Sequence, residues 1–199
     1  MKKKLVLIDG HSILNRAFYG VPDLTNAKGF HTNAIYGFLN ILFKILEEEK
    51  PNYLAVAFDV KAPTFRHEMY AEYKGTRKPM PDELRVQLPI IKDLLKQMNI
   101  TTIEIPEIEA DDIVGSISRK FNEEFILVSG DKDLLQLVND NTTVWLTQKG
   151  ISNVLKVDEN VLMEEFKIKP YQVIEMKAIM GDSSDNIPGV VGIGKVGAE

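Results

Sequence analysis

The sequence predicts an α/β fold in which a mainly parallel sheet is flanked by helices. Three short apolar runs, residues 5–8, 54–58 and 125–128, lead directly or within three residues to an Asp. Segments with apolar residues at three- and four-residue steps lie between them, as expected of amphipathic helices. Alternating strands and helices are typical of parallel sheets, whose strands all end at one edge. Open α/β sheets bind ligands at that edge, so we expect the functional site there.

Composition narrows the protein class. The 199 residues suffice for one buried core and the start of a second domain. The sequence has no run of about eighteen uncharged apolar residues, and the apolar run after Lys2–Lys4 is too short for a signal peptide. We therefore expect a cytoplasmic protein without membrane association. With no Cys and three scattered His, any metal site must rest on oxygen ligands.

Charge alone argues against a nucleic-acid ligand, because the net charge is −5. Its distribution argues the other way. If nine acids bind metal, the remaining residues carry +4, and a mildly basic surface around an acidic site suits a phosphate polymer. The nine candidate metal ligands are Asp9, Asp59, Glu109, Asp111, Asp112, Asp131, Asp133, Asp182 and Asp185.

The first strand is expected to end at Asp9 and to turn into a short helix capped by Ser12. Arg16 falls within two turns of Asp9. It is either a solvated surface arginine or a cation that steadies a phosphate beside the carboxylates, and spacing alone favours neither. Residues 33–46 have helical apolar periodicity and belong to the core. The helix ends before Pro51, and a second strand is expected over residues 53–58.

Residues 61–90 mix cations with aromatic residues and have little apolar periodicity before Leu84. Such a segment is a solvated connection, or it binds single-stranded nucleic acid through phosphates and base faces. We favour the second interpretation because the carboxylate edge is adjacent. Pro81 starts a helix, and Pro89 is expected to kink or split it. The cations and rings are Arg66, Lys74, Arg77, Lys78, Arg85, Phe65, Tyr70 and Tyr73.

Further acids begin the next elements. After a strand over residues 101–105, Glu109, Asp111 and Asp112 fall in or just before the first turn of a helix. The helix dipole favours acids there, but three exceed what capping needs. Asp131 and Asp133 follow the strand at 125–129 and open a helix. A strand over residues 143–147, with its tryptophan in the core, and helices over 161–166 and 171–180 complete the pattern.

The glycine-rich tail matches two phosphate-binding patterns in part. Residues 192–197 have dinucleotide-fingerprint spacing and residues 189–195 have phosphate-loop spacing, but no strand precedes either. Val196 also stands where a phosphate loop needs Ser or Thr. The remaining interpretation is a hairpin of two helices, in which Gly192, Gly194 and Lys195 approach a nucleic-acid phosphate.

The clustered acids predict metal chemistry. Two ionised carboxylates about 5 Å apart repel by roughly 3 kcal/mol at an effective dielectric of 20, so several together would raise their own pKa values or need cations. We favour cations. Oxygen ligands without sulfur or imidazole suit Mg²⁺ or Mn²⁺. Two such ions stabilise the attacking and leaving oxygens during phosphodiester hydrolysis.

Five ordered acidic motifs resemble the flap endonuclease/5′-nuclease family, which includes the N-terminal 5′→3′ exonuclease domain of bacterial DNA polymerase I. The resemblance spans essentially the whole chain. The motifs lie at residues 7–10, 57–59, 109–112, 129–133 and 181–189.

The resemblance implies a PIN-like fold for a nuclease domain over residues 1–180. It also implies a helical arch over about 61–90 that threads a 5′ single strand. Residues 181–199 then begin an incomplete helix-hairpin-helix that grips duplex and holds K⁺. The family more often has a Glu-Lys-Thr-like triplet where this tail reads Gly194-Lys-Val.

The resemblance also implies site roles and two or more Mg²⁺ or Mn²⁺ ions. Lys74 and Arg77 match cations that contact the scissile phosphate, Arg16 matches a basic residue behind the first Asp, and Tyr73 matches a base-stacking position. The tighter metal site would comprise Asp9, Asp59, Glu109, Asp111 and Asp112. The second metal or its waters would have Asp131, Asp133, Asp182 and Asp185.

The implied activity is 5′→3′ exonuclease and 5′-flap endonuclease in DNA replication and repair, including removal of flaps and RNA primers. Expected partners are DNA with a 5′ flap or 5′ end, an RNA–DNA hybrid, and a C-terminal polymerase region in the parent protein, with the chain itself monomeric. The alternatives are a non-catalytic branched-DNA-binding module and a PIN-type ribonuclease. A haloacid-type phosphatase is excluded because His11 replaces the second Asp that its chemistry needs.

Overall fold

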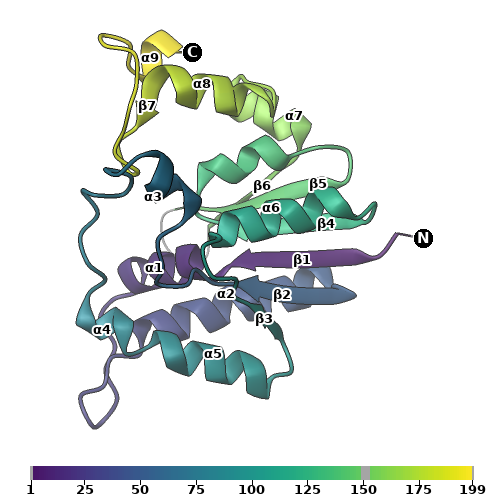
Figure 1. The fold of residues 1–199 in the computed structure, drawn as a ribbon. Helices are drawn as coiled ribbons and strands as arrows, with labels where there is room; N and C mark the ends of the chain where they lie inside the picture. Colours follow the sequence, from purple (N-terminus) through teal and green to yellow (C-terminus); the bar gives the residue numbers. More distant parts are fainter. Residues whose placement is uncertain (1, 149–152, 199) are drawn as a thin grey trace.

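The computed structural model describes residues 2–148 and 153–198. Its six-stranded sheet has the order β3-β2-β1-β4-β5-β6 (Figure 1). The first five strands in this order are mutually parallel, which confirms the expected mainly parallel sheet, whereas β6 pairs antiparallel with β5 and was not predicted. The strands are β1 (Lys4–Asp9), β2 (Tyr53–Ala57), β3 (Thr101–Ile103), β4 (Glu124–Ser129), β5 (Thr142–Thr147) and β6 (Val154–Val157).

The central strands are continuous apolar runs because helices cover both faces of the sheet. Val6 and Ile8 of β1 pack on one face, and Leu7 packs on the other. The register pairs Asp9 with Ala57 of β2, and Ile8 with Val128 of β4. The ends of β1, β2 and β4 therefore reach the same edge, as the apolar runs predicted.

Helices on the two faces bury two apolar clusters. On one face, α1 (Gly10–Gly20), α2 (Asn33–Glu49) and α5 (Leu88–Gln97) pack around Phe38, Phe58 and Trp145. On the other, α6 (Ala110–Lys120) and α8 (Gln172–Met180) pack with the 3₁₀ helix η1 (Lys132–Leu137). Figure 1 shows the two helical layers above and below the sheet. The core position expected for the single tryptophan is confirmed.

Several local predictions differ from the structure. Asp9, not Ser12, caps α1, because its side chain accepts the Ser12 N–H at 3.0 Å. The segment after Asp131 is a 3₁₀ helix rather than an α-helix. Strand β2 stops two residues before Asp59, and β3 is shorter than expected. The expected split at Pro89 is confirmed, because Pro89 occupies the first turn of α5 and the predicted stripe divides into α4 (Asp82–Arg85) and α5.

The segment between β2 and α5 runs along the carboxyl edge of the sheet. It comprises α3 (Phe65–Met69), a series of turns and then α4. In Figure 1 this segment arches past the sheet edge, and α3 lies beside the chain that follows α8. The backbone N–H of Lys74 donates to the Asp185 carbonyl at 2.9 Å, which joins the two segments.

The C-terminal segment folds back onto this edge through two glycines. Gly181 has φ +73°, and a Cβ there would lie 2.3 Å from the Gly189 nitrogen, so side chains are excluded on both sides of the hairpin. The elements are α7 (Glu159–Val161), the π-helical turn η2 (Leu162–Phe166), α8, β7 (Gly181–Asp182), β8 (Ile187–Pro188) and α9 (Lys195–Ala198). Within the described ranges, no helix combines the length and apolar character that a membrane crossing needs.

Candidate metal centre

A cleft of about 210 Å³ opens at the carboxyl edge of the sheet. Its acids come from the ends of β1 and β4, from the loop after β2 and from the start of α6. Lys74 and Arg77 line it from the segment between β2 and α5, called the arch segment below (about residues 61–90). From α1, His11, Ser12 and Asn15 line it. The acidic lining consists of Asp9, Asp59, Glu109, Asp111 and Asp131.

Asp9 is buried at the floor of this cleft, with 8% of its surface exposed. One carboxylate oxygen accepts the Ser12 N–H and the other accepts the Ser129 hydroxyl, both at 3.0 Å. Burial raises the pKa of Asp9 to about 7 despite these hydrogen bonds, and the charges of Asp59 and Asp111 add to the shift. A bound cation would stabilise the ionised form of this carboxyl.

Asp59 is held between two elements. Its Oδ1 accepts the Ala110 N–H at 2.7 Å, which ties the loop after β2 to the first turn of α6. Its own N–H donates to His11 Nδ1 at 3.0 Å. Because Nδ1 accepts this bond, His11 is neutral here, and burial lowers the pKa of its imidazole. His11 therefore acts as a structural support for Asp59.

Glu109, Asp111 and Asp112 form the tightest acidic group among the described residues. Glu109 precedes α6 as its N-cap, and the other two lie in the first turn. One ligand atom from each lies within 4.8 Å of the others. Burial raises the pKa of Asp111 to about 6, and the charges of Asp112 and Glu109 add to this effect. The predicted placement of these acids at a helix start is confirmed.

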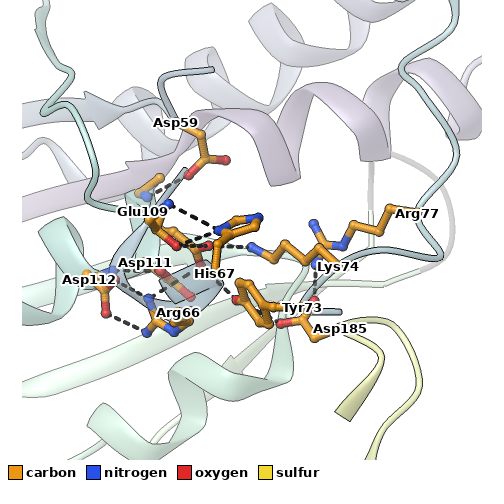
Figure 2. A network of polar contacts seen from close by, with 12 residues as sticks. Asp59, Arg66, His67, Tyr73, Lys74, Arg77, Glu109, Asp111, Asp112 and Asp185 are labelled. Carbon is orange, nitrogen blue, oxygen red and sulfur yellow. Dashed lines mark hydrogen bonds and ion pairs between the residues drawn. The ribbon is translucent and has the colours of Figure 1, made fainter. Parts of the chain in front are cut away.

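Cations of the arch segment face this group (Figure 2). Lys74 Nζ lies 2.9 Å from Glu109 Oε1. Arg66 donates two hydrogen bonds to Asp112, at 2.6 and 2.8 Å. The cluster is therefore a mixed network of charges in which cations already contact the carboxylates.

Tyr73 differs from the sequence-based expectation. Its ring is only 5% exposed, so it offers no free face on which a base could stack. Its hydroxyl oxygen lies 3.0 Å from Glu109 Oε2 and 3.1 Å from Asp185 Oδ2, so its single proton is shared between these two acceptors. Burial raises the pKa of Tyr73, and the charges of Glu109 and Asp185 raise it further. The side chain bridges two acids instead of presenting its ring.

The remaining acids form two ion-paired groups. Asp185 pairs with Arg77, which also donates to the Ser184 carbonyl at 3.1 Å. Lys177 Nζ lies 2.8 Å from Asp133 and 2.6 Å from Asp182. Burial opposes ionisation of Asp182, but hydrogen bonds from Lys177 and Ser184 outweigh it and lower its pKa to about 2. Burial raises the pKa of Asp133.

Arg16 lies behind the cleft, against Gly130. A Cβ on Gly130 would lie 3.4 Å from Arg16 Nη2 and 3.1 Å from both Ser12 Oγ and Thr147 Oγ1. A side chain at residue 130 would therefore require these three polar side chains to shift by a few tenths of an ångström. Arg16 is thus close to the turn that carries Asp131.

The other nucleic-acid candidates lie at the surface. Lys78, Gly192 and Gly194 are exposed, and Gly192 has φ +86°. A Cβ on either glycine would meet open space. The Lys195 side chain lies outside the part of the chain that the structure describes.

The donor set of the cleft fits a hard divalent cation. All five acids offer oxygen, the chain has no cysteine, and the ring nitrogen of His11 nearest Asp59 already accepts a backbone N–H. Carboxylate oxygens of this kind are ligands for Mg²⁺ and Mn²⁺. Burial raises the pKa values of Asp9 and Asp111, so a bound divalent cation would favour their ionised forms.

Comparison with known proteins assigns the family. Residues 4–167 match the family model described as 5′-3′ exonuclease, N-terminal resolvase-like domain. The chain belongs to the 5′-3′ exonuclease family. DNA polymerase I of Bacillus subtilis (strain 168) is 49% identical over 197 residues, which cover 98% of this chain and 22% of that polymerase. The chain thus spans about a fifth of the length of that curated relative.

Solved structures carry the same fold. The T5 5′-exonuclease with bound zinc is 25% identical and superposes with a TM-score of 0.77 over 98% of this chain and 73% of that one. The bacteriophage T5 D15 flap endonuclease, in a pseudo-enzyme–product complex with DNA and metal ions, gives the same values. These relatives confirm the PIN-like architecture expected for a 5′-3′ exonuclease.

Sequence reasoning missed the contacts of two cations near this cleft. Lys177 was not singled out, although it stands five residues before Asp182 on the preceding helix. Arg66 was included in the basic segment, but its pairing with Asp112 was not predicted, because 46 residues separate them. The acids that Lys177 and Arg66 contact could be identified only from the folded structure.

Proposed function

We propose that this chain is a Mg²⁺- or Mn²⁺-dependent 5′→3′ exonuclease and 5′-flap endonuclease that hydrolyses phosphodiester bonds. Its roles would be flap and RNA-primer removal in DNA replication and repair. The observation that carries the proposal is the cleft in which five acids from four segments of the chain face two arch cations. Family membership supports the same chemistry.

Two or more divalent ions would be held by the acids of this edge. By the family resemblance, Asp9, Asp59, Glu109, Asp111 and Asp112 would form the tighter site, and Asp131, Asp133, Asp182 and Asp185 would serve the second ion or its waters. Bound there, the ions would activate water and stabilise the leaving oxygen. The chain's own contribution is to hold the ligands, as Ser129 holds Asp9 and the Ala110 N–H holds Asp59.

Lys74 and Arg77 would bind the phosphate next to the scissile bond. Each now contacts a carboxylate, Glu109 or Asp185, and a phosphodiester would offer the same donors an anionic acceptor with two free oxygens. Arg16, close to the turn after β4, would steady the phosphate from behind the acids. The exposed Lys78 would contact the threaded strand.

Substrate and partners are part of the proposal. DNA with a 5′ flap or 5′ end is supported by the T5 flap endonuclease complex with DNA, and an RNA–DNA hybrid is a further substrate. A polymerase region in the parent protein is supported by the relative from B. subtilis. Residues 1–180 would form the nuclease domain, and residues 181–199 would begin a duplex-binding, K⁺-holding helix-hairpin-helix. Cytoplasmic location and a monomeric state stay predictions.

The test is digestion of a 5′-flap DNA with Mg²⁺ or Mn²⁺ and with EDTA, with product lengths mapped. Asp131→Ala combined with Asp133→Ala should abolish cleavage while circular dichroism stays native. Asp140→Ala, which changes an exposed acid outside the cleft, is the control and should cut normally.

Three results would overturn the proposal. Full cleavage by the double variant would remove the acids from the chemistry. Flap binding without products at any metal concentration would indicate a non-catalytic branched-DNA-binding module. Preference for RNA with no dependence on a 5′ junction would indicate a PIN-type ribonuclease.

A further inference from the structure

Asp112 differs from the other two acids of its cluster in the cavity that it lines. Glu109 and Asp111 line the 210 Å³ cleft, whereas Asp112 does not. Asp112 lines an adjoining cavity of about 400 Å³ beside α6, together with Arg66 and Arg119, and Asp111 lines both cavities. In Figure 2, Asp112 and Arg66 lie on the side of Asp111 that faces away from Asp59.

Both carboxylate oxygens of Asp112 are engaged by one guanidinium. Arg66 Nη1 donates to Oδ2 at 2.6 Å, and Nη2 donates to Oδ1 at 2.8 Å. This bidentate geometry is the strongest form of the arginine–carboxylate pair, and it fixes the relative orientation of the guanidinium and carboxylate planes. Each side chain is 29% exposed, so water screens the pair only in part.

The same guanidinium also reaches the proposed metal ligands. Arg66 Nη1 lies 3.6 Å from Glu109 Oε2. Arg66 belongs to the first turn of α3, where the arch segment begins, and Asp112 belongs to the first turn of α6. The pair therefore joins the base of the arch to the helix that presents Glu109 and Asp111.

We propose that Arg66 and Asp112 are a positioning pair, in which Asp112 neutralises Arg66 instead of ligating a metal ion. A divalent ion on Asp112 would meet the guanidinium charge on the same carboxylate, and like charges repel strongly at such short range. The neutral pair instead orients Glu109 and anchors α3. This inference rests on the proposed metal-dependent function and reassigns one acid that the family resemblance placed among the ligands.

The positioning role and the ligand role of Asp112 predict different metal affinities for a variant that lacks the charges of both Asp112 and Arg66. If Asp112 only neutralises Arg66, Asp112→Asn alone leaves an uncompensated cation beside Glu109, which competes with metal there. Combining it with Arg66→Gln removes that cation and restores a neutral, hydrogen-bonding pair. If Asp112 is a ligand, the double variant still lacks one ligand.

The experiment measures Mn²⁺ dissociation constants by calorimetry on the whole chain, without DNA. Asp112→Asn should weaken binding about 10-fold or more, in the range seen when the support of a ligand is lost. The double variant Arg66→Gln/Asp112→Asn should bind within about threefold of the parent. Asp111→Asn is the ligand standard and should weaken binding at least as much as Asp112→Asn.

Asp82→Asn/Arg85→Gln is the matched control, because this exposed Arg–Asp pair lies outside the cleft, and it should bind Mn²⁺ normally. A second readout is hydrogen exchange of residues 65–69. Arg66→Gln alone should speed exchange there, because α3 loses its link to α6.

The outcomes distinguish the positioning pair from the metal centre itself. If the double variant binds Mn²⁺ as weakly as Asp111→Asn, Asp112 is a ligand and the positioning inference is wrong. Unchanged exchange in Arg66→Gln would also contradict the anchoring role. If Asp111→Asn itself binds Mn²⁺ like the parent, the proposed metal centre fails, whatever the Arg66 variants do.

Discussion

Asp111→Asn should make the metal-free protein more stable while it weakens metal binding. Asp111 lies in the first turn of α6, where burial and the charges of Asp112 and Glu109 oppose its ionisation. Asparagine has the same shape and keeps an oxygen to accept the Asp112 N–H, which now lies 2.7 Å from Asp111 Oδ1. The substitution therefore removes a charge and little else.

The size of the effect can be worked from the pKa of Asp111, which is raised from 3.8 to about 6. Each pKa unit corresponds to about 1.4 kcal/mol, so ionising this carboxyl in the folded state costs up to about 3 kcal/mol. Because the folded-state pKa lies above the unfolded value, the penalty is absent below pH 4. It grows between pH 4 and 6 and is complete above pH 6. Partial screening by water reduces the expected gain for asparagine to about 1–3 kcal/mol at pH 8.

Urea unfolding in EDTA measures this difference. The variant should gain most at pH 8 and about half as much at pH 5, because the carboxyl of the parent protein is then partly protonated. Added Mn²⁺ should raise the stability of the parent protein more than that of the variant, because only the parent keeps the full ligand set. Asp140→Asn, on the exposed surface, controls for the loss of one negative charge. A variant that is less stable than the parent at pH 8, or a gain that does not shrink at pH 5, would refute the reasoning.

Three further predictions test other parts of the molecule. Lys74→Ala with Arg77→Ala should slow single-turnover flap cleavage by about 100-fold or more while Mn²⁺ affinity is retained, and equal rates would remove the arch from the mechanism. Trp145→Ala should lower the free energy of unfolding by about 3–5 kcal/mol, since the ring is 1% exposed; a loss under 1 kcal/mol would contradict its core role. Burial opposes ionisation of Glu49, but hydrogen bonds from Lys156 and Lys4 outweigh it and lower the pKa of this carboxyl below 4.5. Glu49→Gln should therefore lower the free energy of unfolding by about 1 kcal/mol near pH 7. That loss should disappear in thermal melts as pH falls through the lowered pKa, and a constant difference down to pH 3 would be evidence against the ion pair.

The parallel sheet and its acidic edge could be predicted because buried parallel strands have a recognisable sequence pattern. Continuous apolar runs identify β1, β2 and β4, and parallel pairing then places their ends together. Strand β6 lacks this pattern, since Lys156 interrupts its apolar residues and two of its four residues are only partly buried. The 3₁₀ form of η1 was also missed, because three- and four-residue steps are hard to distinguish over six residues.

The acids themselves were identified from the sequence, but their partners were not. Which cation meets which carboxylate depends on the path of the arch and of the hairpin at residues 181–189. Tyr73 is the clearest case, because an aromatic residue among cations predicted stacking, whereas the fold buries the ring and uses its hydroxyl. Side-chain direction in turns has no periodicity from which it could be inferred.

The pairing of β1 with β4 also sets the time at which the cleft can exist during synthesis. Asp9 is made early, yet the hydroxyl that holds it belongs to Ser129, 120 residues later. A nascent chain released before residue 129 therefore carries Asp9 without the β4 residues that complete the cleft. Contacts between residues so far apart in sequence are also slow to form. A ribosome-bound intermediate of this protein should remain without the acidic cleft until the fourth strand has left the exit tunnel.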